Sequence, residues 1–300
     1  MRYAEHPVGP ALAERIECIW IAEDADAAPT APERVLPDGC LEWIFHLGSP
    51  YADGSGRPQA TSFLASPTTG PLEIAPTGPV STMGVRFRPG GARGLLPPLS
   101  LFHGAFPTPE EAWDGEGRRA QEEVGNAPGF RARRAVVERF LEKRLERARA
   151  SSSRLPAAVS LVLARRGRLP VGRIAERVGC SRRQLEREFA EGVGLSPKEL
   201  SRIARFQNVL RLAGRNPAAG WADLAARCGY ADQAHLVREF RAFSGATPTS
   251  SKEETHGALA RYFIDPARLD TLLSSSSSGR AATPEPAPVA FLQDPAGAPV

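Results

Sequence analysis

Two short segments place arginine side chains at spacings that suit contacts to an anionic polymer. The first, GCSRRQLEREF, contains Arg182, Arg183 and Arg187, and the second, GYADQAHLVREF, contains Arg238. A guanidinium group is planar and always charged, so it can donate two parallel hydrogen bonds to a phosphate or to the edge of a guanine. The chemistry that these residues predict is binding of a polyanion rather than catalysis.

The charge of the chain is distributed unevenly along its 300 residues. Residues 155–250 contain 16 Lys and Arg against 8 Asp and Glu, a net charge of +8, whereas the whole chain carries only +4 and the remainder therefore −4. A basic block beside an acidic one indicates a polyanionic partner for the basic block. A codon bias toward arginine explains the number of arginines equally well, but it does not explain their placement.

The two arginine segments belong to a repeated unit. Before the turn, four positions match at an offset of 50, namely Ile174, Ala175, Arg177 and Gly179 with Leu224, Ala225, Arg227 and Gly229. After the turn the offset is 51, and the matches are Leu185, Arg187, Phe189, Gly194 and Pro197 with Leu236, Arg238, Phe240, Gly245 and Pro248. Each copy indicates two short helices joined by a tight turn, whose glycine accepts a left-handed backbone. That is the helix-turn-helix pattern.

The second helix of each copy is expected to bury one face and expose the other. Leucine and phenylalanine lie one turn apart on the inward face, at Leu185 and Phe189 and again at Leu236 and Phe240. The outward positions are then Arg183, Glu186, Arg187 and Ala190 in the first copy, and Ala234, Val237, Arg238 and Arg241 in the second, flanked by Gln233 and His235. Such side chains can reach base edges from a helix in a major groove. Arg182, at the helix N-terminus, is better placed for a phosphate.

The alternative is that these outward positions form an ordinary solvated face, with Arg238 paired to Glu239 or to a neighbouring carboxylate. Between the copies, PKELSRIARFQNVLRLAG has apolar residues at helical spacing and predicts a connecting helix. A rigid connecting helix would hold the two outward faces about 34 Å apart, one turn of DNA, so that both enter successive major grooves.

Residues 155 to about 250 resemble the DNA-binding domain of AraC/XylS-family transcriptional regulators. The stretches that carry the resemblance are RIAERVGCSRRQLEREFAEGVGLSPKEL, RIARFQNVLRLA and DLAARCGYADQAHLVREFRAFSGATP. The resemblance implies seven helices that include two helix-turn-helix units. It also implies that the chain binds double-stranded promoter DNA and regulates transcription, for example as an activator. The base-reading positions that it implies are Arg182, Arg183, Glu186, Arg187, Gln233, Ala234, His235 and Arg238. Because Ala234 is short, the second unit is expected to contact fewer bases directly. The sequence specifies neither the operator sequence nor whether the regulator activates or represses transcription.

The first part of the chain indicates strands rather than helices. IECIWIA, LEWIFHL and STMGVRF are rich in branched and aromatic residues, and PDG before LEWIFHL is a turn signal. LPDGCLEWIFHLG and MGVRFRPGGARGLL also resemble an uncharacterised regulatory domain that precedes the DNA-binding module in some family members. We therefore expect an α+β chain. A cupin-like β-barrel or jelly roll with trailing helices would span 1–150, an all-α double helix-turn-helix domain 155–250, and a largely disordered tail 251–300.

A ligand site in the N-terminal domain is less defined. Trp20, Trp43, Phe45 and His46 are candidates to line a pocket for a small-molecule effector, with ordinary core packing as the alternative. His6, His46 and His103 are the domain's only histidines and include no His-x-His pair, so we expect no metal and no cofactor. The four cysteines lack C-x-x-C spacing, so neither a zinc site nor a disulfide framework is expected.

The N-terminus lacks the pattern of a secretory signal, and the chain has no apolar run long enough for a membrane span. We expect a cytoplasmic regulator that is not an enzyme. The sequence leaves open whether the chain also binds RNA polymerase or a second copy of itself. The rival interpretations are a cupin-type metalloenzyme or DNA-modification protein with a DNA-binding tail, and an adaptor whose basic helices bind an acidic protein.

Overall fold

The N-terminal half of the chain folds into two antiparallel sheets. A computed structural model describes residues 1–29, 32–102, 105–148 and 154–248. The first sheet has the order β1-β2-β8-β4-β6, with strands β1 (Arg2–His6), β2 (Ile16–Asp24), β8 (Val80–Phe87), β4 (Leu41–His46) and β6 (Ser62–Ala65). The second has the order β3-β7-β5, with strands β3 (Glu33–Val35), β7 (Leu72–Pro76) and β5 (Tyr51–Asp53). The tail beyond residue 250, for which the sequence predicts disorder, lies outside the described residues.

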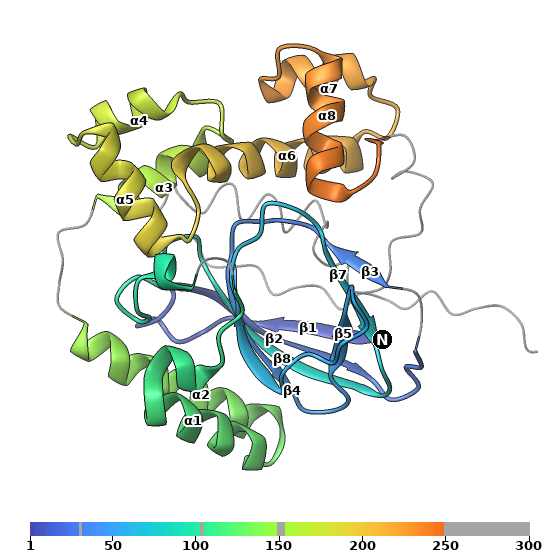
Figure 1. Cartoon of the computed structure of the whole chain (residues 1–300), viewed down its shortest axis with the longest axis vertical. Helices are drawn as coiled ribbons and strands as arrows, with labels where there is room; N and C mark the ends of the chain where they lie inside the picture. Colours follow the sequence, from blue (N-terminus) through green and yellow to red (C-terminus); the bar gives the residue numbers. More distant parts are fainter. Residues whose placement is uncertain (30–31, 103–104, 149–153, 249–300) are drawn as a thin grey trace, which may run out of the picture.

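The two faces of the larger sheet have different coverings (Figure 1). One face packs toward the smaller sheet through a cluster that includes Trp20, Ile44 and Phe63. The other face, with Trp43, Phe45 and Phe87, packs against α1 (Pro109–Asn126) and α2 (Gly129–Arg147), which follow the short 3-10 helix η1 (Leu99–Leu101). The alternation of side chains along a strand explains why neighbouring residues enter different clusters. A β-domain with trailing helices is therefore confirmed.

Along β8, Arg86 alternates with the apolar Val85 and Phe87, a pattern typical of a half-buried strand whose polar face is solvated, but the structure differs. Arg86 is completely buried, because the second sheet covers the face that was expected to be solvated. Its guanidinium forms ion pairs with Glu42 of the neighbouring strand β4 and with Asp38, whose Oδ2 lies 3.3 Å from Nη1. A buried cation needs such partners, since desolvation without them is very unfavourable.

A further carboxyl group lies in the same interior and gives the domain an expected pH dependence. Burial raises the pKa of Glu17 to about 7, against the attraction of Arg86, and its Oε2 has no hydrogen-bond partner among the described residues. The folded chain therefore keeps a proton that the unfolded chain loses near pH 4.5. The resulting stability is complete below that pH and is lost as the pH rises to about 7.

Glu17→Gln is expected to remove the part of this loss that Glu17 causes, on the order of 2–3 kcal/mol. Glu42, whose pKa burial also raises to about 7, keeps a loss of stability over the same pH range in the variant. Urea denaturation of both proteins at several pH values between 5 and 8 measures it. If the two proteins lose stability in parallel over that interval, another group is responsible for the pH dependence.

The C-terminal half is helical and contains two bihelical units joined by a long helix. Residues 154–248 form α3 (Leu155–Ala164), α4 (Val171–Arg177), α5 (Arg182–Gly192), α6 (Pro197–Arg215), α7 (Trp221–Cys228) and α8 (Gln233–Ser244). These are six helices where the resemblance implies seven, and the residues from 249 onward lie outside the described part. Figure 1 shows α6 between the α4–α5 pair at one end and the α7–α8 pair at the other.

The two halves are in contact at several places. Leu36 of the N-terminal half is part of the apolar core of the helical half. Gln207 of α6 donates a hydrogen bond to the carbonyl oxygen of Pro37. Gly39, with φ of +80°, lies so close to α6 that a Cβ there would be 2.6 Å from Leu200 Cδ1. The PDG turn predicted from the sequence is therefore also a contact between the two halves.

Candidate nucleic-acid interface

The first helix-turn-helix unit consists of α4 and α5. Gly179 has φ of +67° in the turn, a backbone conformation that favours glycine. Ser181 caps α5 by accepting from the backbone N–H of Gln184, and the Gln184 side chain accepts from the backbone N–H of Ser181 in return. This capping box fixes where α5 begins, and therefore which residues occupy its first turn. Arg182 and Arg183 follow directly.

The second unit repeats this design in α7 and α8. Gly229 is left-handed, with φ of +79°, and the Asp232 side chain caps α8 by accepting from the backbone N–H of His235 at 2.6 Å. In both units the inward face is buried as predicted, with Leu185 and Phe189 in α5 and Leu236 and Phe240 in α8. Phe240 meets Phe206 of α6 edge to face, so the second unit packs on the connecting helix.

The outward faces are open to solvent. Of the predicted base-reading positions, Arg182, Arg183, Glu186 and Arg187 of α5 are exposed. Gln233, Ala234 and Arg238 of α8 are exposed as well, whereas His235 is half-buried. Seven of the eight predicted base-reading positions are thus accessible, at opposite ends of one connecting helix.

Ion pairs distinguish the arginines from one another. Arg182 pairs with Glu186 at 3.0 Å, and Arg187 lies 4.0 Å from Glu191. Within the described ranges, no ion pair or side-chain hydrogen bond is found for Arg183 or for Arg238. Arg238 does not pair with Glu239, which was the structural alternative for it. Among the predicted base-reading arginines, these two can engage a ligand without giving up a protein partner in the described residues.

His235 is held by the protein on both sides of its ring. Its Nδ1 accepts from the backbone N–H of Ala231 at 3.4 Å, and its Nε2 lies 3.7 Å from Glu239 Oε1. The ring also meets Tyr230 edge to face. With both ring nitrogens directed at protein atoms, His235 is suited to hold the start of α8 rather than to bond a base.

Glu239 was not selected from the sequence as a functional residue. It is nearly buried in α8, where it pairs with Arg202 at 2.6 Å and with Arg205 at 3.5 Å, both from α6. These ion pairs fix the rotation of α8 about its own axis relative to the connecting helix. The internal repeat could have revealed the position, since Glu239 matches Glu188 at the offset of 51.

The four candidates for an effector pocket do not face one cavity. Trp43 and Phe45 point toward α1 and α2, and Trp43 Nε1 donates to Ser62. Trp20 packs on the opposite face of the sheet, as does His46, which lies against Phe63. The two nitrogens of His46 already have Thr82 and Gln59 as partners, at 3.3 Å and 3.0 Å. The geometry accounts for all four side chains as packed interior residues.

Two repeated bihelical units with solvated, arginine-bearing outer faces define a class of DNA-binding proteins. A helix-turn-helix domain model matches residues 174–254, and a domain of unknown function matches residues 4–103. The resemblance to AraC/XylS-family regulators is confirmed by this match: the chain carries an AraC-type helix-turn-helix domain and is a DNA-binding transcription regulator.

Solved structures with a similar arrangement include ToxT from Vibrio cholerae. One ToxT structure has 11% sequence identity and a TM-score of 0.39, with coverage of 84% of this chain and 98% of that one. A second, with bound unsaturated fatty acid, has 12% identity and a TM-score of 0.36, covering 77% and 92%. A search of curated proteins finds no match. None of the described helices combines the length and apolar character needed to cross a membrane.

Proposed function

We propose that this regulator binds promoter DNA with α5 and α8 in successive major grooves on one face of the duplex. The observation that carries the proposal is the placement of two exposed arginine faces at opposite ends of α6. That helix has 19 residues and is therefore about 28 Å long. This length is close to the roughly 34 Å that separates equivalent positions of adjacent turns.

The proposed base contacts come from Arg183 and Arg187 in α5 and from Gln233 and Arg238 in α8. Ala234 can add only an apolar contact, such as one to a thymine methyl group. Arg182 is proposed to contact phosphate, and Glu186 to orient Arg182, with which it pairs. His235 and Glu239 are proposed to support α8 from its protein side.

Selection of duplexes from a random pool by the full-length chain tests the proposal. We expect an enriched sequence with two elements about one helical turn apart, and an affinity that falls steeply with salt because the arginines displace counterions from phosphates. Enrichment of no sequence, together with tight binding to an acidic protein, would favour the adaptor interpretation instead.

We further propose that residues 1–150 regulate the DNA-binding domain at 155–250, and that the protein acts in the cytoplasm. Control by a small-molecule effector, contact with RNA polymerase and pairing of two copies belong to this proposal. It is supported by the contacts that join the two halves at Leu36 and Pro37. Thermal-shift screening, co-purification with polymerase and sedimentation test the three parts separately.

The metalloenzyme alternative has less support. In the part of the chain that the structure describes, no three His, Cys, Asp or Glu side chains are grouped in a way that could hold a metal ion. Burial raises the pKa values of Cys18 and Cys40 well above the ordinary range, which disfavours the reactive thiolate. Metal analysis of the purified protein distinguishes the enzyme from the regulator.

A further inference from the structure

The two recognition helices carry a carboxylate at the same position of the repeat. Glu188 of α5 and Glu239 of α8 match at the offset of 51. Their side chains are 13% and 10% exposed, so both lie on the inward side of their helix, away from the solvated arginine face. A carboxylate in such a position requires a cation, and that cation helps to set the helix orientation.

The cations come from different parts of the molecule. Glu239 pairs with Arg202 and Arg205 of α6, so α8 is oriented within the DNA-binding half. Glu188 Oε2 instead lies 3.5 Å from Arg93 Nη1, and Arg93 belongs to the loop that follows β8 in the N-terminal half. The first recognition helix thus forms an ion pair with the regulatory half. The ion pairs found for α8 in the described residues come from α6, and the regulatory half meets α8 at its C-cap, where a Cβ at Gly245 would be 3.6 Å from Arg34 Nε.

Close packing accompanies this contact. Gly192, the last residue of α5, lies against Arg93, and a Cβ there would be 3.4 Å from Arg93 Cδ and would overlap Leu155. The 3-10 helix η1 of the N-terminal half also packs on α5. Arg93 therefore packs against the C-terminal end of α5 in addition to forming its ion pair with Glu188.

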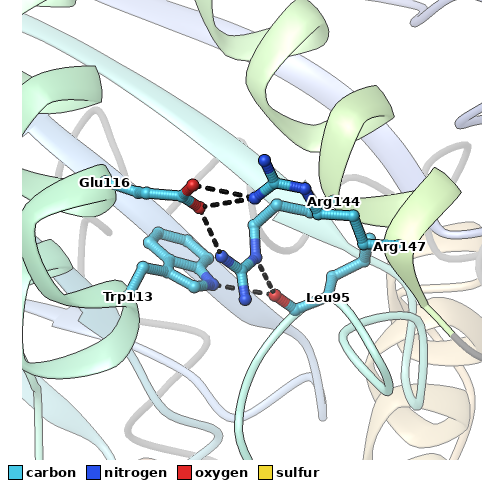
Figure 2. A network of polar contacts seen from close by, with 5 residues as sticks. All are labelled: Leu95, Trp113, Glu116, Arg144 and Arg147. Atoms are coloured by element: carbon cyan, nitrogen blue, oxygen red, sulfur yellow. Dashed lines mark hydrogen bonds and ion pairs between the residues drawn. The ribbon is translucent and has the colours of Figure 1, made fainter.

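The loop that bears Arg93 is itself held in place from the other side. The Arg93 carbonyl oxygen accepts from Arg15 Nη1 at 2.5 Å. Two residues on, the Leu95 carbonyl oxygen accepts from Trp113 Nε1 at 2.8 Å and from Arg144 Nε at 2.9 Å. Figure 2 shows this junction, in which Glu116 of α1 also binds Arg144 and Arg147 of α2. The loop is clamped between the α1–α2 pair and α5.

We propose that Arg93 is a positioning residue for the first recognition helix, through which the N-terminal half orients α5 as α6 orients α8. The inference rests on the proposed function, since it requires that α5 contacts DNA. A change in the position of α1 and α2, or in their hydrogen bonds to the loop that bears Arg93, is therefore expected to alter base recognition by α5. Recognition by α8 is independent of that route.

The test uses the full-length chain and the base preference of each element of the selected duplex. Arg183→Ala and Arg238→Ala first assign the elements to α5 and α8. Arg93→Gln, which removes the charge and keeps a polar side chain, is expected to relax the preference of the α5 element by roughly three- to tenfold. It should leave the α8 element unchanged. The matched control, Arg202→Gln, is expected to do the reverse.

Two further variants separate positioning from folding. Glu188→Gln should reproduce the effect of Arg93→Gln, and the exchange Arg93→Glu with Glu188→Arg should recover part of the α5 preference. Equal loss at both elements, or no loss at either, would overturn the inference while the proposed function stands. A wild-type chain without any base preference would overturn the proposed function, and this inference with it.

Discussion

Arg183→Ala is expected to weaken binding to the selected duplex by roughly ten- to a hundredfold while changing binding to random duplex much less. The side chain is exposed on the outer face of α5, and the described residues offer it no ion pair. A guanidinium in this situation is available for a bidentate bond to guanine, and its loss removes discrimination between bases. Fluorescence anisotropy with both duplexes at one fixed salt concentration measures the two affinities.

Arg182→Ala is the matched control, because Arg182 is the neighbouring exposed arginine at the N-terminus of the same helix. As a phosphate contact, it should weaken both duplexes by about the same factor and lower the salt dependence by roughly one counterion. If Arg183→Ala also shifts both duplexes equally, Arg183 does not recognise bases.

Arg86→Met is expected to destabilise the N-terminal half by about 3–5 kcal/mol. The variant removes the cation from an interior that contains Glu42 and Asp38, and leaves these carboxylates buried without it. Chemical denaturation followed by tryptophan fluorescence measures the loss, since Trp20, Trp43 and Trp113 all lie in this half. Methionine is a long, unbranched apolar side chain that replaces the arginine stem, so the cavity is smaller than with alanine and the effect reports mainly on charge.

Arg57→Ala provides the comparison, because Arg57 is an exposed arginine of the same half and should change stability by less than about 0.5 kcal/mol. Adding Glu42→Gln to Arg86→Met should recover part of the lost stability. Wild-type stability in the single variant would mean that the buried cluster is not held together by this charge.

The local elements were predictable because short-range physics determines them. Branched and aromatic runs gave β2, β4 and β8, and helical periodicity gave α6. The repeat with its turn glycines predicted both helix-turn-helix units, and the inward leucine and phenylalanine fixed which face of each recognition helix would be exposed. When the same apolar spacing occurs in both copies of a repeat, only one orientation of the helix buries its apolar side chains in both.

Contacts between residues that are far apart in the sequence were not predictable in the same way. Arg86 alternates with apolar residues and therefore suggests a solvated position, and only the second sheet explains its burial. The partners of Glu188 and His235 depend on which loops and helices meet in three dimensions. The aromatic residues proposed to line one pocket lie on both faces of the sheet, because Trp43 and Trp20 occupy strands in registers that the sequence does not specify.

The most direct test of the two-groove geometry changes the spacing of the two elements in the selected duplex. Insertions of about half a turn and of about a full turn, roughly 5 and 10 base pairs, separate the effect of helical face from that of distance. Because α6 is a continuous helix of fixed length, only one unit can then bind its element, and we predict that both insertions reduce the affinity at least as much as Arg238→Ala does. Undiminished affinity for either inserted duplex would contradict a single rigid spacing between α5 and α8.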